Sequence, residues 1–151
     1  MTLVSEPGRY FVEAAAVLAS RIYQKQTIVT SCDGDDKENG ECVRIYKIPH
    51  GVQGVFKDAI LCNEVFVPQP MITTAATKNN NVTENTKLFP SKIIGPSGDD
   101  EDVVCPHCLL PEMNVGDWLI FDRMGAYTIS IASRAGRPVM RYVCGGGETA
   151  A

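Results

Sequence analysis

The sequence lacks a long hydrophobic run, an excess of positive charge and the length of a large enzyme domain. Its longest uncharged apolar run near the start, Ala14–Ala19, is far shorter than the roughly 20 residues that cross a bilayer, so we expect no membrane partner. Lys and Arg number 14 against 18 Asp and Glu, and the net charge of −4 argues against a nucleic-acid partner. A chain of 151 residues is about one domain and excludes a complete (β/α)8 barrel, which needs roughly 250.

A secretory signal is also missing from the first residues. Met1–Pro7 contains no basic segment followed by an apolar stretch and a small-residue cleavage site, so we expect a cytoplasmic protein. In a reducing compartment the cysteines are expected to be free thiols. They are Cys32, Cys42, Cys62, Cys105, Cys108 and Cys144.

The segment Cys105–Cys108 has the CxxC spacing with His107 between its two cysteines. This pattern is compatible with a thioredoxin-like redox site, with part of a zinc site, or with a surface loop carrying free thiols. Thioredoxin-like redox catalysis requires the motif at a helix start in an α/β fold. A structural zinc site requires four ligands, and no second ligand pair lies at suitable spacing in the sequence. We therefore favour the loop with free thiols and expect no metal site.

The start of the chain predicts half of a βα unit. Thr2–Val4 is interpreted as the end of a strand, and Glu6–Tyr10 as the turn that follows it. Phe11–Lys25 contains few helix breakers, and its apolar residues fit one face of a 3.6-residue period, which predicts a helix. These apolar residues are Val12, Ala15, Ala16, Ala19 and Tyr23.

The rest of the chain predicts a mainly β, largely antiparallel domain of the sandwich or small-barrel type. Short β-rich segments alternate with turns that contain Gly, Pro and Asp, and polar loops are expected near residues 31–42 and 73–87. The expected strands are Val43–Ile48, Val52–Phe56, Ala59–Val67, Val115–Phe121, Tyr127–Ala132 and Val139–Val143.

Two stretches suggest chemistry. In the turn Glu6–Tyr10, backbone N–H groups beside Arg9 suit a phosphate, and Glu6 suits a protonated ring nitrogen; the alternative is a salt-bridged turn. The second stretch is Leu109–Phe121 together with Met124–Thr128. Taken alone, it reads as a β-hairpin with Trp118 in the core and a turn at Gly116–Asp117.

In combination, these motifs resemble the eukaryotic ornithine decarboxylase family of barrel-type pyridoxal-phosphate decarboxylases. The resemblance also includes Gly51–Phe56, Leu88–Ser91 and Gly95–Pro96. It implies that residues 1–25 are the last βα unit of a truncated (β/α)8 barrel and that residues 26–151 are the C-terminal β-sandwich or Greek-key domain.

The same resemblance implies a pyridoxal 5'-phosphate site. By similarity, Glu6 would hold the pyridinium nitrogen, so that the ring accepts the electrons left by the loss of CO2. Gly8 belongs to the same cofactor-binding turn, and Arg9 and Tyr127 would hold the cofactor phosphate. The cofactor is expected only where the missing barrel is supplied.

The resemblance also assigns two aspartates in the run Asp99–Asp102. Asp99 would bind the distal amine of a basic amino acid substrate. Asp102 would form an ion pair across the family's dimer interface. The run lacks the alternating spacing of calcium-binding loops, so Asp100 and Glu101 are expected to face solvent.

Several positions depart from the family pattern. His50 stands where the family has an aspartate that meets substrate from the partner subunit, and Gly98 stands where it has the cysteine that protonates the reacting carbon. In the family motif that begins at the position of His50, Gln53 replaces the tyrosine. The Schiff-base lysine of the family belongs to the upstream barrel. Without that lysine the chain is expected to be inactive alone. Because a general acid is worth about 10²–10⁴ in rate, the replacements at His50 and Gly98 are expected to leave it impaired as a paralogue.

Two functions follow from the resemblance. The first is the C-terminal portion of an ornithine-decarboxylase-like enzyme of polyamine biosynthesis, in a homodimer or in a heterodimer with a decarboxylase-like subunit. The alternative is a non-catalytic regulator similar to the antizyme inhibitors, which binds a decarboxylase or antizyme. The replacements at His50 and Gly98 favour the regulator, whereas the retained Glu6 and Arg9 favour the enzyme.

Overall fold

A computed structural model describes residues 2–5, 7–30, 41–71, 86–133 and 137–142. The chain begins with a short helix α1 (Gly8–Val12) and a 3₁₀ turn η1 (Glu13–Ala15), and α2 (Asp58–Leu61) is the other helical segment in this part of the chain. Among the described residues, no helix has both the length and the apolar character that a membrane crossing requires.

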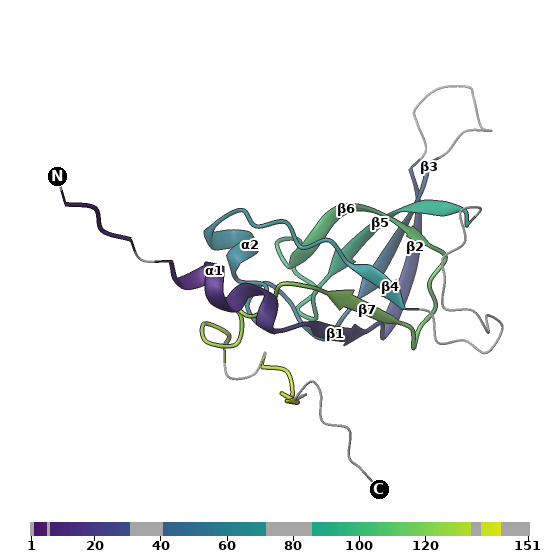
Figure 1. The fold of residues 1–151 in the computed structure, drawn as a ribbon. Helices are drawn as coiled ribbons and strands as arrows, with labels where there is room; N and C mark the ends of the chain where they lie inside the picture. Colours follow the sequence, from purple (N-terminus) through teal and green to yellow (C-terminus); the bar gives the residue numbers. More distant parts are fainter. Residues whose placement is uncertain (1, 6, 31–40, 72–85, 134–136, 143–151) are drawn as a thin grey trace, which may run out of the picture.

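The strands form two sheets (Figure 1). One sheet has the order β1-β7-β4 and is antiparallel; its strands are β1 (Leu18–Arg21), β7 (Trp118–Phe121) and β4 (Gln69–Met71). The other has the order β2-β3-β5-β6; its strands are β2 (Gln24–Thr30), β3 (Glu41–Lys47), β5 (Leu88–Ile94) and β6 (Val103–Pro111). Only β3 and β5 pair in parallel among the described strands. The prediction of a mainly β fold is confirmed.

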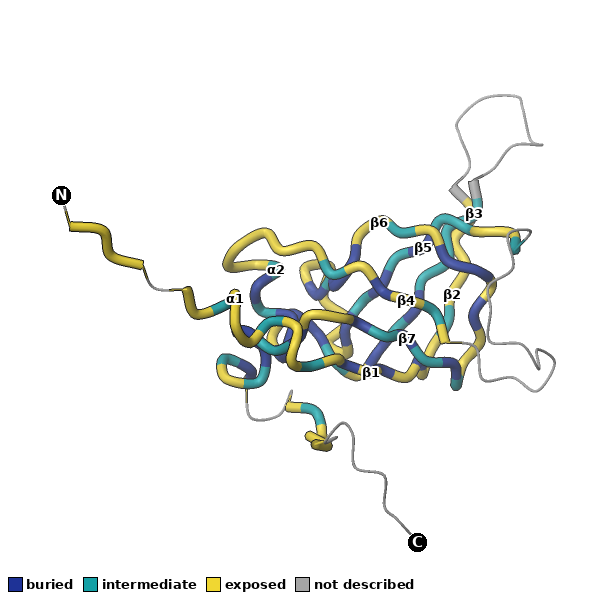
Figure 2. The backbone as a smooth tube through the Cα atoms, viewed as in Figure 1, coloured by how far each residue is buried: buried dark blue, intermediate teal, exposed yellow. Residues whose placement is uncertain are grey.

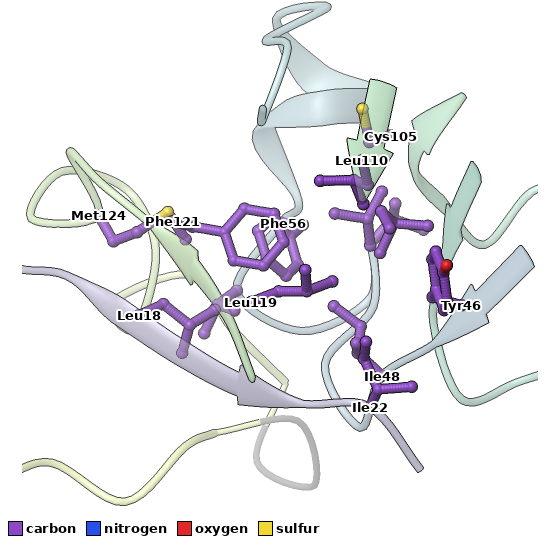
Figure 3. Packing of buried hydrophobic residues seen from close by; sticks show 14 of the residues in the cluster. Leu18, Ile22, Tyr46, Ile48, Phe56, Cys105, Leu110, Leu119, Phe121 and Met124 are labelled. Carbon is purple, nitrogen blue, oxygen red and sulfur yellow. The ribbon is translucent and has the colours of Figure 1, made fainter. Parts of the chain in front are cut away.

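The hydrophobic core collects the inward side chains of both sheets and of the segment before α2 (Figure 3). In β7 the burial alternates, so that Leu119 and Phe121 point inward as expected for a strand with one buried face. Phe56 packs edge-on against Phe121, with ring centroids 4.8 Å apart, and against Phe66 at 5.0 Å. These aromatic contacts hold the turn that contains Phe56 against the smaller sheet.

The helix predicted over Phe11–Lys25 is wrong beyond residue 15. Leu18–Arg21 instead pairs with β7, from Leu18 opposite Phe121 to Arg21 opposite Trp118. Burial follows a period of two, because Leu18, Ser20 and Ile22 are buried and the residues between them are exposed. Pairing with a distant strand therefore overrode the helical propensity of the alanine-rich segment.

Other expected strands need correction. Thr2–Val4 has no regular structure, and its apolar side chains are exposed (Figure 2). Val52–Phe56 and Tyr127–Ala132 form turns, and Ala59–Val67 begins inside α2 and continues as irregular chain. The part of Val139–Val143 that the structure describes, residues 139–142, is also irregular. These segments are buried or apolar but do not pair with a strand. An apolar run alone does not distinguish a paired strand from an irregular segment.

Two long strands were not predicted. β5 was not among the expected strands, and the Cys105–Cys108 part of β6 was expected to be a loop. The Cys105–Cys108 segment therefore lies inside a strand, which corrects the expected surface loop. Likewise, Leu109–Phe121 is not a hairpin, because β6 and β7 belong to different sheets. Val43–Ile48 is confirmed as part of β3, except for its last residue, and the end of Val115–Phe121 is confirmed as β7.

Candidate functional site

The structure brings Gly8, Arg9 and Tyr127 together at the edge of the smaller sheet. The guanidinium carbon of Arg9 lies 5.2 Å from the centre of the Tyr127 ring, a cation–π contact. A β-carbon at Gly8 would lie 3.7 Å from the Tyr127 hydroxyl. Glu6, the predicted partner of the cofactor ring, lies outside the described residues. The predicted convergence of Arg9 and Tyr127 is therefore present, whereas their roles toward a cofactor stay a prediction.

Backbone contacts between η1 and the turn after β7 produce this convergence. Gly125 N–H donates to the Glu13 carbonyl at 2.9 Å, and Met124 N–H donates to the Ala16 carbonyl at 2.9 Å. A side chain at Gly125 would overlap the carbonyl of Val12, so glycine is required for this close approach. Tyr127 then adopts a left-handed backbone with φ of 51°, which helps to place its ring beside α1.

Asp58 is a functional neighbour that the sequence did not indicate. Its carboxylate accepts a hydrogen bond from Arg9 Nη2 at 2.6 Å, and the residue is only 4% exposed. This bond raises the pKa of the Arg9 guanidinium above its ordinary value. Glu13 lies 4.0 Å from Arg9 Nη1 and adds a second negative charge. Asp58 is the first residue of α2, a helix of one turn that no pattern predicted.

Asp102 forms a second cluster, directly before β6, the last strand in the order of the larger sheet. Its buried carboxylate accepts hydrogen bonds from Val52 N at 2.9 Å, Ser97 N at 3.0 Å and Ser97 Oγ at 2.8 Å. Any side chain at Gly51 or Gly95 would overlap that carboxylate. Asp102 therefore ties three separate backbone segments together within this chain. Its predicted ion pair with a partner subunit stays a prediction.

Gly98 and Asp99 lie on the exposed turn before Asp102. Gly98 has φ of 83°, a left-handed conformation that suits glycine and strains other residues. The Asp99 carbonyl accepts the Asp102 N–H at 3.0 Å, so the backbone of Asp99 is fixed while its side chain faces solvent. The arrangement leaves Asp99 available to a ligand, and its role toward a substrate amine stays a prediction.

His50 is half-buried and bonded within its own chain. Its Nδ1 lies 2.9 Å from the hydroxyl of Ser20, which is fully buried. Burial lowers the pKa of the His50 imidazole, so the ring is neutral at physiological pH. A neutral ring held by Ser20 does not supply the negative charge of a carboxylate.

Comparison with known proteins identifies the family. The profile of the pyridoxal-dependent decarboxylase C-terminal sheet domain matches residues 9–125. The chain belongs to this family. It is 36% identical over 146 residues to rat ornithine decarboxylase and 32% identical over 133 residues to human antizyme inhibitor 2, covering 93% and 87% of the chain respectively.

These relatives are much longer. The chain spans 30% of the rat ornithine decarboxylase and 27% of the human antizyme inhibitor 2. In structure it is similar to the arginine decarboxylase of Paramecium bursaria Chlorella virus bound to agmatine, with a TM-score of 0.65 and 28% identity over 83% of this chain and 29% of that one. The chain therefore matches only the C-terminal sheet domain of a pyridoxal-dependent decarboxylase fold.

The contacts around Arg9 do not fit the phosphate of pyridoxal phosphate as they stand. A phosphate dianion needs a cation that is free to pair with it. Here the buried Asp58 already neutralises Arg9, and both Glu13 and Glu64 raise the Arg9 pKa further through their negative charges. The same charges would repel a phosphate. In this arrangement Arg9 is therefore not free to hold the cofactor phosphate.

A pocket beside this cluster is also small. It has a volume of about 190 Å³ and is lined by acidic and apolar residues, among them Glu13, Glu64, Phe66 and Asp122. Cofactor pockets usually measure about 300–1,000 Å³. Among the described residues, no group of three or more His, Cys, Asp or Glu side chains is placed to hold a metal ion. The pocket that contains Glu13 and Glu64 is thus smaller than a usual cofactor pocket.

Proposed function

We propose that this chain is the C-terminal sheet domain of an ornithine-decarboxylase-like protein of polyamine metabolism and that it has no decarboxylase activity by itself. The family match over residues 9–125 supports the domain assignment. The observation that carries the inactivity is the Arg9–Asp58 pair, because it occupies the one guanidinium that the family resemblance assigns to the cofactor phosphate. The Schiff-base lysine belongs to the barrel, so aldimine chemistry also requires that domain.

A division of labour with a barrel domain follows from this proposal. We propose that the segment through η1 belongs to the last βα unit of a barrel and that the strands after it form the β-sandwich or Greek-key domain. β1 and the first residues of β2 precede residue 26 and already belong to the sheets, so the part of residues 1–25 left to complete a barrel is the segment through η1. A dimer with a second decarboxylase-like subunit and a cytoplasmic location stay predictions.

Pyridoxal phosphate absorbance tests this proposal directly. The chain is mixed with pyridoxal phosphate, alone and together with a separately expressed barrel domain of an ornithine decarboxylase, and the absorbance of the internal aldimine and the CO2 released from labelled ornithine are recorded. We expect no aldimine band and no CO2 from the chain alone. Ornithine-dependent CO2 release by the chain alone contradicts the proposal.

The second candidate is a non-catalytic regulator similar to the antizyme inhibitors. Three observations favour it: the neutral His50, the left-handed Gly98 turn without a thiol, and the Asp58 carboxylate on Arg9. Human antizyme inhibitor 2 is 32% identical to the chain, close to the 36% of rat ornithine decarboxylase, so similarity alone does not separate the two functions. Capture of purified antizyme by the chain, or by the chain with a barrel domain, without CO2 release selects the regulator.

The matched variant for both candidates is Asp58→Asn. It keeps the size of the side chain and removes the charge that neutralises Arg9. With a barrel domain supplied, we expect Asp58→Asn to bind pyridoxal phosphate more tightly than the wild-type chain. Equal affinity of the two proteins shows that Asp58 does not control the phosphate contact and removes the main argument for a lost cofactor. Glu112→Gln is the control, because Glu112 pairs with Lys25 and Arg44 in the other sheet.

A further inference from the structure

The pairing of β5 with β6 contains a β-bulge between two cysteines. Cys108 lies opposite Ser91 and Cys105 lies opposite Ile93. These positions are two residues apart on β5 and three residues apart on β6, so β6 accommodates one extra residue. Ser91 and Ile93 are both buried and share one face of the sheet. Their partners Cys105 and Cys108 therefore also share that face.

The bulge changes the distance between the two thiols. In a regular strand, residues three apart point to opposite faces and are separated by about 10 Å, which no disulfide spans. Across the bulge the two cysteines are spaced like residues two apart, whose separation is about 6.6 Å. Disulfides join α-carbons about 4.4–6.8 Å apart. The register thus places Cys105 and Cys108 within disulfide range.

The two thiols also contact each other. A hydrogen bond between the Cys105 and Cys108 side chains lowers the pKa of Cys105 to about 7, while that bond and burial raise the pKa of Cys108. The pair thus loses its first proton near neutral pH and holds one thiolate beside one thiol. A thiolate is the species that attacks a disulfide.

Access to the pair comes through Cys108 and the bulge. Cys105 is fully buried, and Cys108 is partly exposed. Pro106 and His107, which form the bulge, are exposed. Cys108 Sγ lies 3.5 Å from the Ser91 carbonyl oxygen at the strand edge. A small oxidant can therefore reach Cys108, whereas Cys105 is buried in the core with its sulfur 3.6 Å from the His107 carbonyl oxygen and is shielded from solvent.

We propose that Cys105 and Cys108 form a reversible redox site that closes into an intrachain disulfide across the β6 bulge, with a small disulfide such as glutathione disulfide as the oxidant. In the first step the Cys105 thiolate accepts the proton of Cys108, and the Cys108 sulfur attacks one sulfur of glutathione disulfide, forming a mixed disulfide and releasing one glutathione thiolate. In the second step Cys105 attacks the Cys108 sulfur and releases the second. Two protein thiols are oxidised, one glutathione disulfide is reduced to two thiols, and the two protein protons pass to them.

Closure would fix the start of β6. Cys105 lies three residues after Asp102, whose carboxylate ties Val52 and Ser97 together. A covalent bond across the bulge therefore lies next to the cluster that holds the Gly98–Asp99 turn. This site does not depend on the proposed function, because it needs neither a barrel nor a cofactor.

Peptide mapping tests the proposal on the full chain. The protein is equilibrated at neutral pH with mixtures of reduced and oxidised glutathione, quenched with acid, alkylated and cut with trypsin. The tryptic peptide from residue 93 to residue 123 follows Lys92, ends at Arg123 and contains these two cysteines only. We expect this peptide to lose two hydrogen atoms and both alkylation sites under oxidising mixtures, and to recover them on reduction.

Variants separate the pair from other thiols. Cys108→Ser and Cys105→Ser are each expected to abolish the loss of two hydrogens, whereas Cys62→Ser, an exposed cysteine elsewhere, leaves it unchanged. Circular dichroism checks the fold of each variant. Two alkylated thiols in the wild-type peptide at every glutathione ratio overturn the proposal, as does cross-linking to any other cysteine or a mixed glutathione disulfide that never resolves.

The pH dependence of disulfide formation gives a readout that does not rely on replacing the buried Cys105. The closing rate in the wild-type protein is expected to rise with pH and level off above about pH 7, following the shared thiol proton. Glutathionylation of Cys62 in the same sample serves as the internal reference. Identical pH profiles at Cys62 and at the pair overturn the role of the shared proton in the proposal.

Discussion

Replacing Asp102 by alanine is expected to destabilise the domain more than any neighbouring acidic substitution. The Asp102 carboxylate is 5% exposed and accepts hydrogen bonds from Val52 and from two groups of Ser97. In Asp102→Ala the N–H of Val52 stays in the core without an acceptor, which costs about 1–3 kcal/mol. Ser97 is exposed, so its two donors turn to water and add less than about 1 kcal/mol together.

The total for Asp102→Ala is therefore about 1–4 kcal/mol of unfolding free energy. For a chain of this size, each kcal/mol lowers the melting temperature by about 2–4 °C. The matched control is Asp99→Ala, three residues earlier, whose side chain is exposed. Substitutions at such positions usually change stability by less than about 0.5 kcal/mol.

Urea unfolding followed by the fluorescence of the single tryptophan, Trp118, measures both variants. The midpoint of Asp102→Ala is expected to fall well below that of Asp99→Ala at an unchanged slope. An Asp102→Ala midpoint within error of Asp99→Ala refutes the role of Asp102 as an internal anchor. If Asp102 acts mainly at a dimer interface, the substitution instead changes the mass found by sedimentation and leaves the unfolding of the monomer unaltered.

Three further substitutions have defined outcomes. Gly125→Ala forces a methyl group against the Val12 carbonyl and is expected to cost about 1–3 kcal/mol in urea unfolding, with no change as the contradictory result. Burial lowers the His50 pKa, so the unfolded state binds the proton more readily, and stability is expected to fall as pH drops below about 6.5; His50→Gln should remove that slope, and a slope that persists rules out this assignment. The bond from Lys25 lowers the pKa of Glu112, so the charged side chain stabilises the protein at pH values above its ordinary pKa of about 4.3, and this contribution is lost as the pH falls through the lowered pKa. Because the Glu112 side chain is 44% exposed, Glu112→Gln should cost only about 0.2–1 kcal/mol at neutral pH, and a larger loss contradicts a surface ion pair.

The sequence predicted the class of the fold better than its elements. Short β-rich segments separated by turns indicated a mainly β protein, and β3 was placed within two residues at its start and one at its end. The Phe11–Lys25 prediction failed because the apolar residues that fit a helical period in that segment are equally compatible with an extended chain. What decides the structure there is the partner strand Trp118–Phe121, about 100 residues away, which local patterns do not contain.

β6 was missed for a related reason. The CxxC segment was expected to be a loop, and Pro106 is compatible with a strand only at a sheet edge, a strand start or a bulge. The bulge removes the conflict, because a proline at a bulge needs no ladder hydrogen bond. The register shift depends on the pairing with β5, so neither the bulge nor the contact between Cys105 and Cys108 was accessible before the strands were placed.

The candidate site was predicted in part, through resemblance. Arg9 and Tyr127 were expected to meet, and they do, although the resemblance and not the spacing indicated it. Asp58 was not foreseen, because nothing in its neighbours indicates that α2 begins there or faces Arg9. A resemblance transfers the positions that a family motif contains, whereas a charged residue outside those motifs, such as Asp58, becomes visible only through its contact.

The Arg9–Asp58 pair therefore carries more weight for function than the similarity scores. A carboxylate that is 4% exposed is strongly destabilised if its cation is taken away, by about 3–5 kcal/mol for a buried pair. The exposed part of the Arg9 side chain, 35%, reduces that figure but does not remove it. A phosphate that competes for Arg9 must supply this free energy as well as overcome the charges of Glu13 and Glu64. A relative that binds the cofactor does not need to meet that cost unless it carries an acid at the same place, so the family's cofactor dependence does not transfer to this chain by similarity alone.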